Sequence, residues 1–278
     1  MPEVTARGVR FHVQTLEPRA GAAADPPVVV FVHGLILDDL ASFHYTLAGP
    51  VAAAGARPVL YDQRGHGRTG RPATGYTPED AVADLFAVLD ALDVRGPVFL
   101  VANSFGGLVS LNAALARPGR VAGLVLIESY GPAAQAEGWA EDVLNTLART
   151  ALALEYEDLA GRLLRSGERR RGRQAATAGG LVNGTSLLAD LAAARPVLPA
   201  ALATLPCPVL AVYGEHSDVV DAGRLLLRSV PDCTLHIMAG HAHTVLREGT
   251  AELLEVMLPW LAHHAGTAVP AASAGGTA

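Results

Sequence analysis

A serine stands where an apolar segment gives way to a glycine-rich one, in the stretch VANSFGG at residues 101–107. Ala102 and Gly106 lie two residues before and after Ser104, and Gly107 follows. A sharp turn from a buried strand into a helix needs small residues at these positions, and it exposes the serine hydroxyl for nucleophilic attack. The free N–H groups of the helix N-terminus would lie beside that hydroxyl. The alternative interpretation is a serine that only caps a helix.

A serine nucleophile needs a base and an acid, and the chain offers candidates for both. His241 and His243 occur in the stretch AGHAHTVLREG, after the last apolar run. Asp218 occurs in YGEHSDVV after the run before it, and Glu128 occurs in LIES after an earlier run. Acidic residues near strand ends also cap loops and helices, so each of these residues has a structural interpretation as well.

The elements that must position these residues alternate regularly along the chain. Apolar runs predict strands, and the segments between them carry apolar residues at helical spacing. Alternation of this kind predicts an α/β fold with a parallel sheet covered on both faces. The predicted strands span residues 8–18, 27–34, 57–65, 97–104, 121–129, 207–214 and 233–240, and the predicted helices span 42–55, 77–94, 105–118, 219–230 and 243–264.

The alternation stops at residue 130, and only helices are predicted before it resumes. They span residues 138–153, 155–166 and 173–194. We therefore expect a core of residues 1–130 and 206–264, a helical lid at 131–205 and a disordered tail at 265–278. The insertion joins two strands, so it should cover the carboxyl edge of the sheet, where open α/β sheets bind ligands. The alternative is an appendage that only packs on the core.

The composition of the chain argues against several classes of partner and cofactor. The 278 residues carry a net charge of −6 with no long basic face, which argues against a nucleic-acid partner. No apolar stretch is long enough for a signal peptide or a membrane helix, so we expect a cytoplasmic protein with no membrane partner. Cys207 and Cys233 lack metal-ligand spacing and are expected to be buried thiols, without a metal or cofactor. Monomer and homodimer both stay open.

Three further features, together with VANSFGG, resemble the α/β-hydrolase fold superfamily over most of residues 8–264. VANSFGG resembles the G-x-S-x-G nucleophile elbow with alanine at the first position. FVHGL (31–35) resembles the turn that carries the oxyanion hole. YDQRGHGRTG (61–70) is similar to a mostly structural loop, so His66 is expected to be a loop residue. The third feature is the order serine, acid, histidine along the chain. The resemblance implies a mostly parallel sheet with a helical lid after the sixth strand.

The resemblance also implies roles for individual residues. Ser104 would be the nucleophile, and the backbone N–H groups of Leu35 and Phe105 would bind the oxyanion. Asp218 would be the acid, because a Ser-Asp loop at this place is familiar in the superfamily. Glu128 is the alternative, because some members place the acid after the preceding strand.

The family's spacing also decides between the two histidines. Many members carry a glutamate five residues after the catalytic histidine, and Glu248 stands at that distance from His243. His243 is therefore the expected base. His241, which follows a glycine as in many members, is the alternative.

The implied function is a serine hydrolase that cleaves a small ester or thioester through an acyl-enzyme. A C–C bond hydrolase, an acyl-transfer or cyclising enzyme, and a non-catalytic binder are the alternatives. Serine at the elbow argues against epoxide hydrolases and haloalkane dehalogenases, which use aspartate there. Five arginines in residues 165–173 could receive a substrate bound to coenzyme A or a carrier protein. A solvated loop is the alternative, in a chain whose basic residues other than histidine are all arginine.

Overall fold

The computed structural model describes residues 3–148 and 178–266, which form one eight-stranded sheet with helices on both faces. The strand order is β1-β2-β4-β3-β5-β6-β7-β8. The hairpin of β1 and β2 joins β4 antiparallel, and every later pairing is parallel. The strands are β1 Glu3–Ala6, β2 Val9–Thr15, β3 Val28–Val32, β4 Arg57–Tyr61, β5 Val98–Asn103, β6 Val121–Ile127, β7 Val209–Gly214 and β8 Cys233–Met238.

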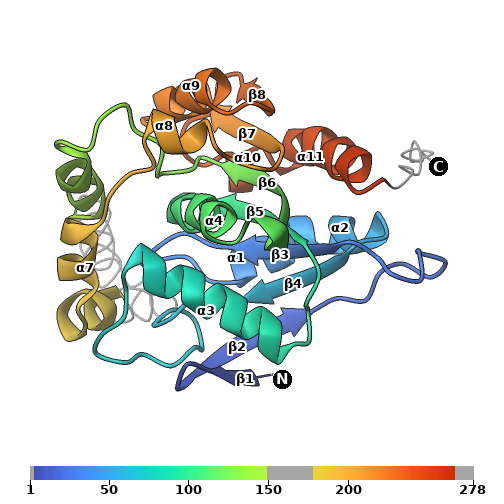
Figure 1. Ribbon diagram of the computed structural model, residues 1–278, viewed down its shortest axis with the longest axis horizontal. Helices are drawn as coiled ribbons and strands as arrows, with labels where there is room; N and C mark the ends of the chain where they lie inside the picture. The colour runs from blue at the N-terminus through green and yellow to red at the C-terminus, as the bar shows by residue number, and fades with distance from the viewer. Residues whose placement is uncertain (1–2, 149–177, 267–278) are drawn as a thin grey trace, which may run out of the picture.

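Two apolar layers separate the sheet from its helices. One layer lies under α3, α4 and α9, and the other lies under α1, α2, α10 and α11 (Figure 1). The helices are α1 Ala41–Phe43, the π-helical η1 His44–Ala48, α2 Gly49–Ala53, α3 Pro78–Ala91, α4 Phe105–Ala116, the 3-10 helix η2 Pro118–Arg120, α7 Leu187–Ala193, α8 Pro199–Leu202, α9 Val220–Ser229, α10 Val245–Glu248 and α11 Thr250–His264. The predicted α/β fold with a mostly parallel sheet is confirmed.

The structure differs from the predicted elements in detail. Strand β1 was not predicted, because four residues at a sheet edge carry no apolar run; Arg7 and Gly8, both at positive φ, turn the chain from β1 into β2. The predicted helix 243–264 is two helices, which Gly249 separates. A β-carbon at Gly249 would lie 2.3 Å from the Met238 methyl group, so the chain at this break packs closely against β8.

The predicted insertion is helical in its described part. Helical turns at 139–148 and 178–184 and helix α7 lie together at one side of the sheet (Figure 1). The predicted helix 173–194 is interrupted at residues 185 and 186. The predicted helix 155–166, the arginine-rich stretch and nearly all of the predicted tail lie outside the described residues. No helix in the described ranges is long and apolar enough to cross a membrane.

The first turn of α4 packs tightly against the end of β3. A β-carbon added to Gly106 would lie 2.1 Å from the Val32 carbonyl oxygen and 2.8 Å from that of His33. Both obstacles are backbone atoms, one in the last residue of β3 and one in the residue that follows, and they cannot move aside as a flexible side chain could. Glycine is therefore required at this position by contact with β3.

We expect Gly106→Ala to lower the free energy of unfolding by about 2–3 kcal/mol or more, because the added methyl group overpacks the junction. Urea denaturation would measure the loss. Gly119→Ala is the control, since a β-carbon there meets nothing within 4 Å. Equal losses in the two variants would contradict the steric explanation.

Candidate active site

Ser104 lies on a strained turn between β5 and α4. Its backbone angles are φ 54° and ψ −122°, a combination that side-chain-bearing residues rarely adopt. The turn is fixed from both sides: the Ser104 N–H donates to the carbonyl of Ile127, and its own carbonyl accepts from the N–H groups of Gly107 and Tyr130, each at 3.0 Å. Strain that is held in this way at a half-buried serine is a mark of a functional position.

A cavity of about 210 Å³ opens over Ser104. The expected oxyanion residues Leu35 and Phe105 line it, and so does His243. Val143 and Leu147 of the insertion line it as well, which places this part of the insertion beside the carboxyl ends of the strands. The structure therefore brings the predicted nucleophile, base and oxyanion donors to one cavity.

The turn after β3, where an oxyanion donor is expected, is held by a buried histidine. Ile36 stands at φ 66°, and its N–H donates to Nε2 of His66 at 2.9 Å. Nδ1 of His66 lies 2.9 Å from the carbonyl oxygen of Arg64. Nδ1 therefore carries the proton, and a single neutral tautomer satisfies both contacts. The expectation that His66 is a structural loop residue agrees with this geometry.

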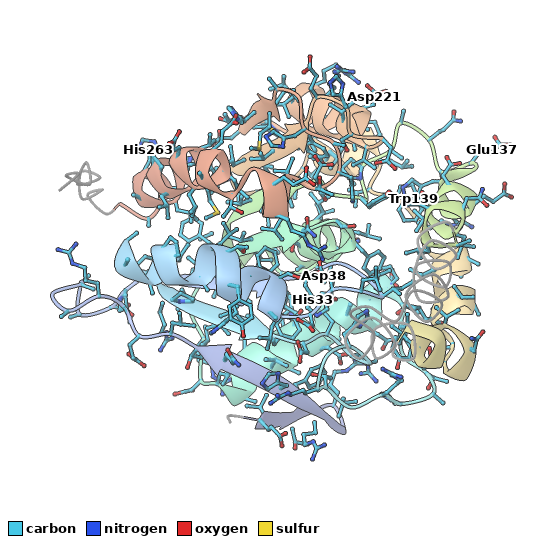
Figure 2. All side chains as sticks on the ribbon, turned by 180° about the vertical axis from the view of Figure 1, so that it is seen from behind. His33, Asp38, Glu137, Trp139, Asp221 and His263 are labelled. Carbon is cyan, nitrogen blue, oxygen red and sulfur yellow. The ribbon has the colours of Figure 1, made fainter. Side chains whose placement is uncertain are left out.

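Burial, and secondly the electrostatic influence of the neighbouring His33, whose ring centroid is 5.2 Å away, lowers the pKa of His66 to about 3. The His66 imidazole is therefore uncharged at neutral pH. His33 is itself buried, accepts the Gln63 N–H through Nε2, and lies next to Asp38 in the middle of the molecule (Figure 2).

Of the two candidate bases, His243 is the one in the cavity. Its side chain is 36% exposed, and its ring packs edge-on against Tyr130 with centroids 5.5 Å apart. His241 does not line the cavity and instead lies beside Gly249. No hydrogen bond joins Ser104 Oγ to His243 in the described part of the chain; this contact is commonly long in free enzymes and tightens when substrate binds.

Two carboxylates approach Nδ1 of His243, and they differ in environment. Glu128 Oε2 lies 3.0 Å from Nδ1 and Asp218 Oδ1 lies 3.5 Å from it. The Glu128 side chain is fully buried, whereas that of Asp218 is 61% exposed. The contact between Glu128 and His243 is short enough for an ion pair, but its geometry does not meet the criteria for a hydrogen bond.

Glu128 is held in place from strand β7. The Gly214 N–H donates to its Oε1 at 2.5 Å, and the Ser217 hydroxyl donates to its Oε2. The backbone of Glu128 stands at φ 50°, so Glu128 joins Ile36 and Ser104 as a side-chain-bearing residue at positive φ at this sheet edge. A buried carboxylate costs free energy unless hydrogen bonds compensate it, and these two donors do so.

Tyr130 and Asp38 are among the residues of the cavity wall that were not predicted from the sequence. Burial, and secondly the charge of Asp218, raises the pKa of Tyr130 to about 12, so its hydroxyl stays protonated. Tyr130 lies shortly after the end of β6 at Ile127. Because the site residues follow strand ends, this position could have predicted Tyr130 from the sequence. Asp38 carries no comparable signal, because it lies in an irregular loop.

The described residues contain no group of three or more His, Cys, Asp or Glu side chains that could hold a metal ion. Cys207 is buried and Cys233 is half-buried, and burial raises their thiol pKa values to about 11 and about 12. Neither cysteine lines the cavity.

The fold and the strained serine define the class: an α/β-hydrolase with serine at the nucleophile position. More particularly, the chain belongs to the serine aminopeptidase, S33 family, whose family model matches residues 24–250. A non-heme chloroperoxidase from Streptomyces lividans is 42% identical to it over 78 residues, which is 28% of each chain. A 2-hydroxymuconate semialdehyde hydrolase from Pseudomonas sp. (strain CF600) is 33% identical over 130 residues, covering 46% of this chain and 43% of that protein.

A solved carboxylesterase structure from Nitrososphaera gargenis has a TM-score of 0.72 at 22% identity, over 95% of this chain and 99% of that chain. This likeness shows the fold. The chain spans less than half the length of either curated relative, so their activities enter only as proposals.

The buried His66 makes folding depend on pH. Its folded pKa lies below its unfolded value, so the unfolded chain binds more protons, and stability falls as the pH drops below about 6.5. Between pH 7.5 and pH 5 this one group should account for a loss of about 2 kcal/mol. Urea denaturation at both pH values should show a smaller loss for His66→Gln. His216→Gln, at a histidine with a 66% exposed side chain, should keep the wild-type loss. An unchanged loss in His66→Gln would rule out His66 as the source.

Proposed function

We propose that the protein is a serine hydrolase that cleaves a small ester or thioester through an acyl-enzyme. One observation carries the proposal: the strained Ser104 shares a cavity with His243, whose Nδ1 faces a fully buried carboxylate. A serine, a histidine and an oriented acid form the constellation that nucleophilic acyl transfer requires.

Each residue has a role in the proposed reaction. His243 removes the proton from Ser104 Oγ as the oxygen attacks the substrate carbonyl. The negative charge that develops on the carbonyl oxygen is stabilised by the N–H groups of Leu35 and Phe105. The leaving group takes the proton back from His243, and the acyl group stays on Ser104. Water then attacks the acyl-enzyme with His243 as base, releasing the acid and the free serine.

We assign the orienting acid to Glu128 and a secondary electrostatic role to Asp218. The imidazolium that forms during attack is stabilised most by a near carboxylate that water does not screen. Glu128 is both nearer and buried, whereas the exposed Asp218 acts through solvent. The family resemblance implied the opposite order, with Asp218 as the acid and Glu128 as the alternative.

A fluorophosphonate probe tests the nucleophile directly. We expect it to label the wild-type protein, and we expect Ser104→Ala to abolish both labelling and the hydrolysis of p-nitrophenyl esters and acyl-coenzyme A thioesters. Ser110→Ala is the control, because this buried serine lies in helix α4, which directly follows Ser104, and its hydroxyl has no partner among the described residues. A folded wild-type protein that resists labelling would instead support a non-catalytic binder.

Paired amide substitutions test the acid. Glu128→Gln should lower kcat/KM by about 10³-fold or more, because the wrong histidine tautomer is stabilised and the imidazolium loses its partner. Asp218→Asn should lower it by about tenfold or less, since an exposed charge is screened. The reverse order of the two losses would assign the acid to Asp218.

A C–C bond hydrolase is the second candidate. The sequence Asn103-Ser104-Phe105 followed by two glycines resembles elbows of such enzymes, and one relative is by name a muconate semialdehyde hydrolase. The same labelling experiment applies to it, while turnover of a dienoate substrate in preference to simple esters would distinguish it. The proposed role of the arginines at 165–173 in receiving a carrier lies outside the described residues.

A further inference from the structure

The two N–H groups of the expected oxyanion hole come from separate elements. Leu35 lies in the turn after β3, and Phe105 is the first residue of α4. Strands β3 and β5 lead to these residues and pair in parallel, with Val32 opposite Ala102 as their last partners. Beyond that pair the strand ladder no longer sets the distance between the two donors, so other contacts must set it.

One carboxylate bridges the two segments beyond the ladder. Asp38 Oδ2 accepts the N–H of Gly34, in the turn after β3, at 2.9 Å. The same oxygen accepts the side-chain amide of Asn103, the last residue of β5, at 3.1 Å. Asp38 Oδ1 accepts the hydroxyl of Ser42 in α1. A carboxylate only accepts hydrogen bonds, so all three donors match its ionised form.

The turn and the nucleophile elbow also lie in direct contact. A β-carbon added to Gly34 would lie 3.1 Å from Asp38 Oδ2 and 3.2 Å from the β-carbon of Ser104. Asp38 is half-buried and lies beside His33 in the interior of the molecule (Figure 2). Water has limited access to its hydrogen bonds there, and hydrogen bonds are stronger in such surroundings than at a surface.

The expected donor Leu35 stands between two anchored residues. The Gly34 N–H before it donates to Asp38. The Ile36 N–H after it donates to Nε2 of His66 at 2.9 Å. The Leu35 N–H itself donates to no other residue in the part of the chain that the structure describes. The two flanking bonds thus fix the turn and leave the middle N–H for a ligand.

We propose that Asp38 is a positioning residue, which acts through Gly34 and Asn103 to hold the two oxyanion donors at the separation that the transition state requires. The inference rests on the proposed function, and it gives Asp38 no contact with the reacting atoms. Full negative charge on the carbonyl oxygen develops only during the reaction, so an error in the separation weakens the transition state more than the bound substrate.

A purely structural role for Asp38 makes a different prediction. If Asp38 only stabilised its loop, its loss would weaken folding and substrate binding together. Loss of a positioning residue instead lowers kcat and leaves KM nearly unchanged. The charge of Asp38 acts in the opposite direction, because a negative group near Ser104 opposes the oxyanion. A fall in kcat after its removal therefore reports the lost bridge and not a lost electrostatic stabilisation.

Asp38→Ala removes the bridge. We expect kcat for a p-nitrophenyl ester to fall about 10²-fold, with KM within about threefold of the wild-type value, because a small misplacement of the donors is costly. The affinity for a trifluoromethyl ketone with the same acyl chain should fall in parallel with kcat, since its tetrahedral adduct needs both donors.

Asp38→Asn should have a kcat at least about tenfold higher than that of Asp38→Ala. Its amide oxygen can accept from Gly34 and Asn103, and its amide nitrogen can donate to Ser42, whose hydroxyl can accept as well as donate. Asn103→Ala removes only the contact with β5 and should lower kcat by about tenfold with little change in KM. This second variant keeps the test decisive if Asp38→Ala does not fold.

Asp39→Ala is the matched control, because Asp39 is the adjacent carboxylate, accepts the Ala41 N–H and does not line the cavity. It should keep the wild-type kcat. A wild-type kcat in both Asp38→Ala and Asn103→Ala would overturn the inference, as would losses that lie in KM alone. Equal losses in Asp38→Ala and Asp38→Asn would also overturn it.

Failure of the proposed function has a separate signature. In that case the wild-type protein would neither react with the fluorophosphonate probe nor hydrolyse the ester. An active, labelled wild-type protein whose kcat does not depend on the bridge would leave the proposed function intact and overturn only the role of Asp38.

Discussion

The close approach of helix α4 to the carboxyl ends of β3 and β6 is the constraint on which the site depends. Gly106 lies against β3 carbonyls, and a β-carbon on Gly107 would lie 1.6 Å from the Ser129 hydroxyl oxygen. Because the helix must begin this near the sheet, the preceding residue has to absorb the change of direction, and Ser104 does so in a strained conformation. Packing of the core thus supplies the geometry that lifts the hydroxyl out of the sheet.

The strand ends beyond α4 are tied together by one buried charge. Glu128 at the end of β6 is hydrogen-bonded from the end of β7 by Gly214 and Ser217. Gly214 also lets the histidine loop pass close by, because a β-carbon there would lie 2.4 Å from the His241 carbonyl oxygen. A carboxylate without these partners would be too costly to bury. Gly214 therefore serves two purposes: its N–H donates to Glu128, and its lack of a side chain leaves room for the loop that carries His243.

The sequence predicted the sheet and the elbow because both depend on local patterns. Apolar strand runs and small residues around Ser104 are visible in single stretches of the chain. Hairpin strand β1 and the helix break at Gly249 were missed, since they depend on contacts made only after folding. The choice between Glu128 and Asp218 could not be made from spacing, because both follow strands. What separates them is burial and the direction of neighbouring donors, which are properties of the folded chain.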